Sequence, residues 1–216
     1  MIELKNYSKS FGTNQIFSNQ NICFNDNLFI GFYGPSGCGK STLLNSISML
    51  DFNYEGQIIV NGQNISDMKA KKREEFRRDN FAYVFSEANL LSYLSAEENV
   101  LLPLTFLKRK KPADYDHLTE LLNLGNLMDH NVNTLSEGEK QRFSVLRALI
   151  TGQPFVVCDE PTAHLDHDNS LLLVKKLKEI ANNEHRMIMM SCHDDSLLSY
   201  FDIVYGINNK ELYEKK

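Results

Sequence analysis

The stretch that decides the fold is "LFIGFYGPSGCGKST", from Leu28 to Thr42. An apolar run typical of a buried strand leads into a glycine-rich turn, and the pattern predicts a helix that begins near Gly39. The turn matches G-x-x-x-x-G-K-[ST] in the strand-to-helix context that this motif requires. Its backbone amides can converge on a β-phosphate, Lys40 can reach the β- and γ-phosphates, and Ser41 can offer a hydroxyl to Mg²⁺. The stretch therefore predicts a nucleoside triphosphate site rather than an ordinary glycine-rich turn. The residues expected to contact the nucleotide are Gly34, Pro35, Ser36, Gly37, Cys38, Gly39, Lys40, Ser41 and Thr42.

A second motif, the acidic "PFVVCDEPT" at residues 154–162, supports the same chemistry. Its apolar run ends in Asp159, which would deliver a carboxylate to the edge of a sheet where Mg²⁺ binds. Glu160 follows at once and could polarise an attacking water. The alternative is a buried strand that ends in a solvated acidic turn, and the phosphate loop argues against it.

Apolar strands alternate with helical patterns along the chain, and no internal repeat interrupts them. Strands are predicted at residues 1–8, 21–25, 28–33, 81–85, 154–159, 186–191 and 201–207. Helices are predicted at residues 70–80, 137–150 and 168–183, and 56–65 reads as two extended pieces around an Asn-Gly turn. Residues 86–133 are predicted to be helical, with breaks at Pro112 and at 122–127. This alternation predicts an α/β fold with a mostly parallel sheet covered on both faces.

The composition sets bounds on this interpretation. The chain has 216 residues, of which 42% are hydrophobic and 24% charged, as in a globular protein with one large domain or one domain with an inserted lobe. Its net charge of −5 gives no basic field, so no nucleic-acid partner is expected. No leader pattern or apolar run of spanning length occurs, so work at a membrane would need another chain. The four cysteines lack a CxxC pair, which favours reduced thiols and a cytoplasmic location.

The motif "LSEGEKQR", from Leu135 to Arg142, has two interpretations by itself. Ser136 followed three residues later by Glu139 is a capping box, in which both side chains satisfy free amides at a helix start. A helix N-terminus also attracts phosphate, because its free N–H groups and its dipole favour an anion. Both uses rely on the same helix end, so they are compatible.

Four motifs then occur in one order: "GPSGCGKST", "LSEGEKQR", "VVCDEPTAHLD" and "MMSCHD". Together they resemble the ATP-binding subunits of ABC transporters, over the range from Phe11 to His193. The stretch "LLSYLSAEENVLLPL" further resembles the branch that contains lipoprotein-release, macrolide-export and antimicrobial-peptide-resistance ATPases. The resemblance implies a single domain over 1–216. Its P-loop NTPase core would comprise 1–85 and 134–216, with an antiparallel β subdomain and an inserted helical subdomain at about 86–133.

The resemblance also implies a shared site. Two subunits would close head to tail, so that Ser136 and Gly138 of one face the γ-phosphate of ATP held by the other. Phe11 matches the aromatic residue that stacks on adenine, and His193 matches the histidine that contacts the γ-phosphate. Asp166 matches the loop between the two ATP sites.

The same resemblance assigns catalysis to Glu160, His193 and Lys40, and Mg²⁺ to Ser41, Asp159 and Ser86. Ser86 is a departure, because the family normally has glutamine there, which reaches Mg²⁺, the water and the membrane partner. Serine is too short for that role, so either Glu87 substitutes or hydrolysis is slow.

The motif "LSEGEKQR" departs from the family as well. Glu137 stands where glycine is usual and Glu139 where glutamine is frequent. We expect these two carboxylates to oppose phosphate binding until a second subunit brings Lys40 and Mg²⁺.

The expected partners are a second ATPase subunit, as a homodimer or a pair, and a separate membrane permease. A cytoplasmic helix of the permease would dock near residues 86–94, which would hold the protein peripherally on the inner face of the membrane. One alternative is a DNA-repair or translation ATPase. DNA-repair relatives interrupt the core with long coiled coils and translation factors carry two cores per chain, whereas the span over residues 40–136 is compact and lacks heptads. Another is a regulatory module that closes on ATP and barely hydrolyses it, and Ser86 keeps this alternative open.

Overall fold

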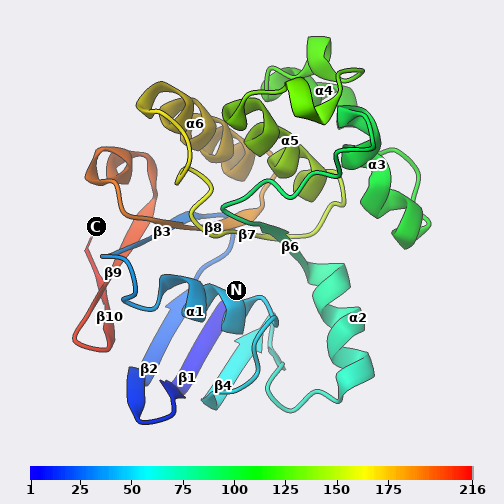
Figure 1. The fold of residues 1–216 in the computed structure, drawn as a ribbon. Helices are drawn as coiled ribbons and strands as arrows, with labels where there is room; N and C mark the ends of the chain where they lie inside the picture. The colour runs from blue at the N-terminus through cyan, green and yellow to red at the C-terminus, as the bar shows by residue number, and fades with distance from the viewer. Residues whose placement is uncertain (216) are drawn as a thin grey trace.

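Two β-sheets organise the computed structural model, which describes residues 1–215 (Figure 1). The larger sheet has six strands in the order β10-β9-β3-β8-β7-β6. These are β3 (Phe29–Tyr33), β6 (Phe81–Val84), β7 (Phe155–Cys158), β8 (Met187–Cys192), β9 (Ile203–Asn208) and β10 (Glu211–Glu214). Only β10 runs antiparallel to its neighbour among the pairings described. The predicted, mostly parallel sheet is therefore confirmed, and β10, which follows a turn at Asn209 and Lys210, was not predicted.

The smaller sheet is antiparallel, with the strand order β2-β1-β4-β5. Its strands are β1 (Ile2–Phe11), β2 (Asn14–Phe24), β4 (Glu55–Val60) and β5 (Gln63–Asn64). The predicted Asn-Gly turn joins β4 to β5, with φ values of 48° at Asn61 and 76° at Gly62. The pair β1–β2 runs longer than predicted, because irregular register interrupts the apolar alternation.

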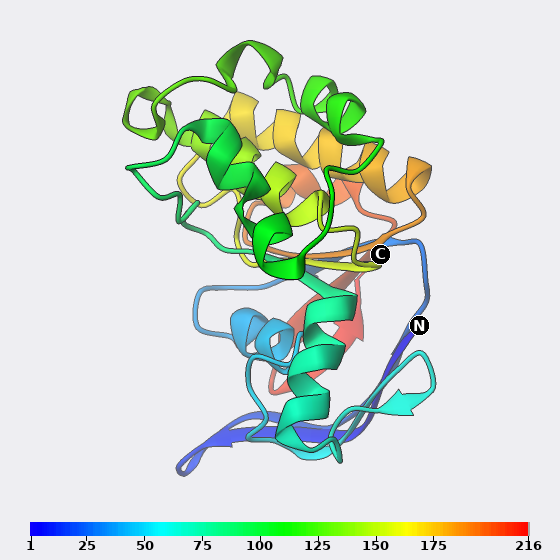
Figure 2. The same cartoon turned by 90° about the vertical axis from the view of Figure 1, so that its right-hand side faces the viewer.

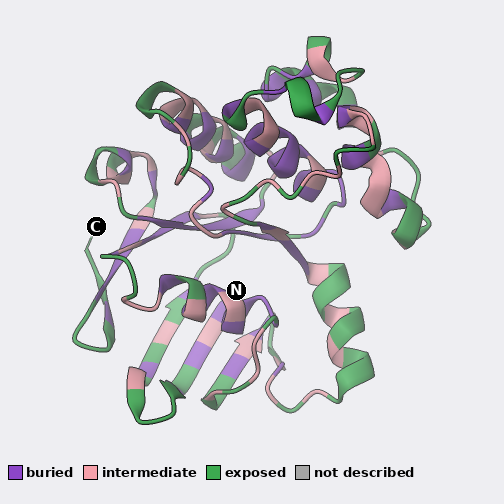
Figure 3. Ribbon diagram, in the orientation of Figure 1, coloured by how far each residue is buried: buried purple, intermediate pink, exposed green. Residues whose placement is uncertain are grey.

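Helices cover both faces of the six-stranded sheet (Figures 1 and 2). Helix α1 (Lys40–Ile47) lies between the two sheets, and the opposite face carries α3 (Ala96–Leu107), α4 (Tyr115–Leu121), α5 (Glu137–Leu149) and α6 (His167–Asn183). Two separate apolar clusters fill these layers, and the central strands β7 and β8 between them are buried throughout (Figure 3). This double burial explains the continuous apolar runs of the parallel strands. Within residues 1–215, no helix has the length and apolarity needed to cross a membrane.

Helix α2 (Ala70–Asn80) begins and ends as predicted and has no buried residue. The stretch before α3 differs from the prediction, because α3 begins only after Ser95. The buried side chain of Asn99 explains this difference. Its Oδ1 accepts from the Leu91 amide at 2.6 Å, and its Nδ2 donates to the Leu91 carbonyl at 3.0 Å. These bonds hold the loop in a non-helical path. Short 3₁₀ turns occupy Gly125–Leu127, Val132–Thr134 and Asp195–Tyr200.

Candidate functional site

The phosphate loop lies between β3 and α1, and its backbone requires glycine. Gly37 and Gly39 have φ values of +79° and +111°, and a Cβ on Gly39 would lie 2.6 Å from Ile16. The side chain of Lys40 folds back over this loop and is only 3% exposed. Its ammonium donates to the carbonyl oxygens of Gly34 at 2.8 Å and Pro35 at 3.1 Å. The loop therefore holds a buried cation beside the free amides of a helix start, as an anion site requires.

Oxygen atoms converge on Asp159, at the end of β7. Ser41 donates to its Oδ1 at 2.9 Å, and Ser191 donates to the same oxygen at 2.7 Å. The Tyr83 hydroxyl lies 3.4 Å from Oδ2 and donates to Asn45 Oδ1 at 2.8 Å. Burial and the Asp159 charge raise the pKa of Tyr83, so it stays a neutral donor. Mg²⁺ prefers carboxylate and hydroxyl oxygens with phosphate oxygens completing its shell, so Ser41 and Asp159 fit this ion.

Sequence reasoning missed three of these residues. Ser191 carried a usable signal, because it is a polar residue near the end of a buried apolar strand. Asn45 stands one helical turn after Ser41, which also places it on the same side of α1. Tyr83 carried no separate signal, since an aromatic residue in a buried strand is ordinary.

Glu160 lies at the centre of the predicted catalytic group. It adopts a left-handed backbone with φ of 46°, which is a strained conformation for a residue other than glycine. Its amide donates to Ser191 Oγ at 2.7 Å. Its carboxylate lies 3.1 Å from Lys40 Nζ and 3.9 Å from His193 Nδ1. The structure thus brings together the three residues predicted to be catalytic, although they come from the start of α1 and from the segments after β7 and β8.

The aromatic residue predicted to stack on adenine lies at the tip of the β1–β2 hairpin. The Phe11 side chain is 54% exposed, so a ring face is accessible. The ammonium of Lys9 lies 4.7 Å from the centre of the ring. Lys9 is buried and pairs with Asp51 at 2.6 Å. This support fixes one side of the ring.

The predicted capping box is confirmed at the start of α5. Ser136 donates from its amide and its hydroxyl to Glu139 Oε2, at 2.7 and 2.8 Å, and the Glu139 amide donates to Ser136 Oγ at 3.3 Å. Although burial acts in the opposite direction, these bonds hold the pKa of Glu139 below its ordinary value. Glu137 pairs with Lys140 at 2.7 Å. Lys140 therefore offsets the charge of Glu137, whereas Glu139 keeps its negative charge and accepts its hydrogen bonds from the neutral Ser136.

No hydrogen bond or ion pair within residues 1–215 joins the start of α5 to the phosphate loop of the same chain. Ser136 is exposed, whereas Gly138 is buried against α6. Asp166 caps α6 and accepts from the Asn169 amide at 2.8 Å. Apart from Phe11 and Ser86, the predicted residues thus form two groups: one surrounds the phosphate loop, and the other surrounds the α5 and α6 helix starts.

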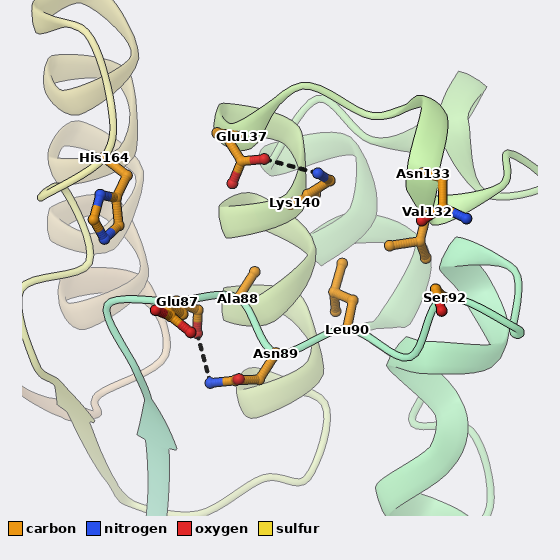
Figure 4. Close-up of a pocket in the computed structure, with 10 residues that line it drawn as sticks. All are labelled: Glu87, Ala88, Asn89, Leu90, Ser92, Val132, Asn133, Glu137, Lys140 and His164. Carbon is orange, nitrogen blue, oxygen red and sulfur yellow. Dashed lines mark hydrogen bonds and ion pairs between the residues drawn. The ribbon is translucent and has the colours of Figure 1, made fainter.

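Ser86 and Glu87 follow β6 in a loop that α5 holds in place. Gln141 donates to the Phe85 carbonyl at 2.8 Å, just before Ser86. The Glu87 carboxylate borders a hollow of about 510 Å³ (Figure 4). The other residues that line it are Ala88, Asn89, Leu90, Ser92, Val132, Asn133, Glu137, Lys140 and His164. No hydrogen bond or ion pair in the described chain joins Ser86 or Glu87 to Asp159.

Comparison with known proteins places this geometry in context. A family model described as ABC transporter matches residues 17–163. An uncharacterised ABC transporter ATP-binding protein of Methanocaldococcus jannaschii is 33% identical, over 99% of this chain and 98% of that protein. The bacitracin export ATP-binding protein of Halalkalibacterium halodurans is also 33% identical, over 99% of this chain and 87% of that protein. A macrolide export ATP-binding/permease protein of Campylobacter jejuni is 32% identical over 98% of this chain, which spans 33% of that protein.

Solved structures agree with these relatives. The ABC transporter cassette MJ0796 of Methanocaldococcus jannaschii is 29% identical to this chain. Its dimeric structure has a TM-score of 0.87 to this fold, and the comparison covers 100% of this chain and 98% of that one. A second dimeric structure of the same cassette, in a post-hydrolysis state with ADP and phosphate, has a TM-score of 0.86 at the same coverage.

Proposed function

Because the chain belongs to the ABC transporter family, as its motifs predicted, we propose that its two groups of site residues act across a dimer. The chain is an ATP-binding subunit of this family and an ATPase. The observation that carries the hydrolytic half of this proposal is the convergence of Lys40, Glu160 and His193 beside the Ser41–Asp159 pair. Charge that develops on a transferred phosphoryl group needs donors and a positioned base at this spacing.

We assign the chemistry to residues of this site. The loop amides and Lys40 bind the phosphates, and Ser41 and Asp159 would hold Mg²⁺, which neutralises phosphate charge when bound. Lys40 contacts Glu160 in this structure, and ATP phosphates would compete for the same ammonium. Glu160 then becomes available to orient and polarise the attacking water. His193, whose Nδ1 lies 3.9 Å from the Glu160 carboxylate, would contact the γ-phosphate.

The second group of residues acts on ATP held by another copy. Ser136 and the amide of Gly138 would cap the γ-phosphate across the interface, and Asp166 would lie between the two sites. The separation of these residues from their own phosphate loop supports this arrangement. The similar cassette MJ0796 forms dimers, which supports it independently.

A separate membrane permease would dock beside the 86–94 loop and hold the subunit at the membrane. Three large apolar side chains near this side of the molecule are exposed to solvent: Phe85 at 44%, Tyr93 at 79% and Phe106 at 79%. Exposed aromatic side chains of this size are typical of protein interfaces. The Campylobacter jejuni relative is named as both ATP-binding and permease protein, so a cassette of this type works with a permease there.

Two alternatives were a non-transport ATPase and a regulatory module with slow hydrolysis. The relatives described above are ATP-binding proteins of transporters, which does not favour the first. The second also lacks support, because a similar cassette is known in a post-hydrolysis state.

A Glu160→Gln variant tests the proposal. It should keep ATP binding, lose roughly 10²–10⁴-fold in hydrolysis and accumulate as a dimer with Mg²⁺ and ATP, because the positioned base is absent. Lys40→Ala is the matched control, since it removes the buried phosphate ligand and should prevent both binding and dimer formation. Turnover, ATP affinity and light scattering would be measured on each. Wild-type turnover in Glu160→Gln, or wild-type ATP affinity in Lys40→Ala, would contradict the assignment.

A further inference from the structure

One side chain connects the two helix starts that the proposed site needs. Asn169 lies in the first turn of α6, three residues after the cap Asp166. Its Nδ2 donates to Asp166 Oδ2 at 2.8 Å, while its Oδ1 accepts from Arg142 Nη1 of α5 at 3.2 Å. The two bonds fix the orientation of the amide, because a flipped amide would turn its NH₂ group toward the guanidinium.

The contact also has a steric component. A Cβ on Gly138 would lie 3.0 Å from both Cγ and Oδ1 of Asn169. The absence of a side chain at Gly138 therefore lets the amide pack directly against the start of α5. Displacing Asn169 would leave this helix start without its neighbour from α6.

Arg142 gives this contact energetic importance. The residue is 9% exposed, and burial lowers its pKa. Its Nε has no hydrogen-bond partner within the described chain. The Asn169 side chain therefore accepts a hydrogen bond from this buried guanidinium. A hydrogen bond to a charged group contributes more to stability than one between neutral groups.

The chain path links this contact to catalysis. Glu160 follows β7, and the segment from Glu160 to Asp166 leads directly into α6. Asn169 thus ties the helix start that carries Ser136 to the loop that carries Glu160. In the dimer proposed above, those two residues of one chain serve different ATP molecules.

We propose that Asn169 is a positioning residue that couples the two ATP sites, by joining the α5 start to the Glu160–Asp166 loop within each chain. This inference rests on the proposed trans arrangement. It predicts that loss of the amide loosens the ATP-bound dimer while nucleotide binding to the single subunit is unaffected, because Asn169 does not touch the phosphate loop.

Asn169→Leu, introduced into the Glu160→Gln background, tests this proposal. Leucine has nearly the same shape as asparagine and a higher helix propensity, which limits other effects of the substitution. Because the variant also removes a hydrogen bond from the buried Arg142, its thermal unfolding is measured as well, and dimerisation is compared at a temperature where both proteins are folded. We expect ATP-driven dimerisation to weaken about tenfold, as the loss of one hydrogen bond to a charged group allows. Affinity for a fluorescent ADP analogue should stay within about twofold. Asn182→Leu, at an exposed position on the same helix, is the matched control and should change neither quantity.

A second measurement separates coupling from simple packing. In the otherwise wild-type chain, Asn169→Leu should lower kcat with little change in KM. Adding Arg142→Met should cost little more than the more severe single change, because both remove the same contact. Unchanged dimerisation in Asn169→Leu, or fully additive effects, would overturn the inference. Failure of Glu160→Gln itself to dimerise would instead contradict the proposed function.

Discussion

The hydroxyl of Ser136 has two competing acceptors: the Glu139 carboxylate and, in the proposed dimer, a γ-phosphate. In this structure it donates to Glu139 Oε2 at 2.8 Å. To act on a γ-phosphate from the other subunit, the same proton must leave that carboxylate. Glu139 therefore stabilises the α5 start and opposes its use as a phosphate site, through both the hydrogen bond and its negative charge.

Glu139→Gln should relieve this opposition. Glutamine keeps the capping box, so α5 should fold normally, while one negative charge beside the phosphate is removed. We expect ATP-driven dimerisation to become about fivefold tighter, the scale of about 1 kcal/mol for a partly exposed charge pair. Sedimentation of the variant in the Glu160→Gln background measures this change. Weaker dimerisation would show that the carboxylate itself contributes a contact.

Ser86 and Glu87 can be separated by a pair of variants. Ser86→Gln should raise basal ATP hydrolysis about tenfold if a longer side chain restores one hydrogen bond to the metal-bound water. Glu87→Ala should leave this rate nearly unchanged, because its carboxylate borders the hollow beside α5. Steady-state hydrolysis at saturating ATP gives both values. A sharp loss in Glu87→Ala would show that Glu87 performs the role of the missing glutamine.

Linear motifs made the phosphate-loop and acidic residues predictable, because their spacing is set within a single strand and turn. The neighbours of Asp159 were less accessible to such reasoning. Tyr83 and Ser191 come from β6 and β8, on either side of β7, and meet Asp159 only when these strands pair. Contacts between strands depend on the register of the sheet, which no local pattern specifies.

At the level of elements, α3 and α5 begin with the same capping box. Ser95 and Glu98 start α3 with the reciprocal bonds that Ser136 and Glu139 make at α5. One box is therefore available as a structural control for the other. The two differ in what surrounds them, since only the α5 start belongs to the proposed ATP site.

Ser95→Ala and Ser136→Ala should have similar effects on stability and different effects on function. Each loses a cap worth about 1 kcal/mol, or roughly 2–4 °C in Tm for a chain of this size. Ser95→Ala should retain ATP hydrolysis, whereas Ser136→Ala should lose most of it through failed closure across the dimer. Calorimetry and turnover of the two proteins test the comparison. Equal loss of activity in both would assign Ser136 a structural role only.

Element prediction succeeded where periodicity was undisturbed and failed where a side chain redirected the backbone. Helix α2 matched its prediction because it has no buried residue and no side-chain cap, so its own helical propensity decides where it begins and ends. The loop before α3 was predicted as helix, yet Asn99 holds it through Leu91. Such a bond from a side chain to the backbone of a nearby residue competes with helix formation and leaves no periodic signal in the sequence.

At the scale of the whole molecule, α5 joins the parts that a transport ATPase must coordinate. Its start carries Ser136, and its middle bonds to Asn169 of α6. Its last turn reaches the 86–94 loop, because Arg147 donates to the carbonyl oxygens of Ala88 at 2.6 Å and Asn89 at 2.8 Å. A rigid α5 can therefore transmit a displacement of the 86–94 loop to its own start, which carries Ser136.

Arg147→Met should interrupt this connection at the loop. Methionine retains much of the apolar packing but removes both hydrogen bonds to the loop carbonyls. We expect basal hydrolysis by the isolated subunit to change less than about threefold, since Arg147 has no contact with the phosphate loop. Stimulation by the reconstituted permease should fall about tenfold, because permease contact with the loop would no longer move α5. Hydrolysis would be measured in proteoliposomes and in detergent-free solution, with Arg77→Met on exposed α2 as the matched control. Full stimulation in Arg147→Met would mean that the permease signal reaches the ATP site by a route other than α5.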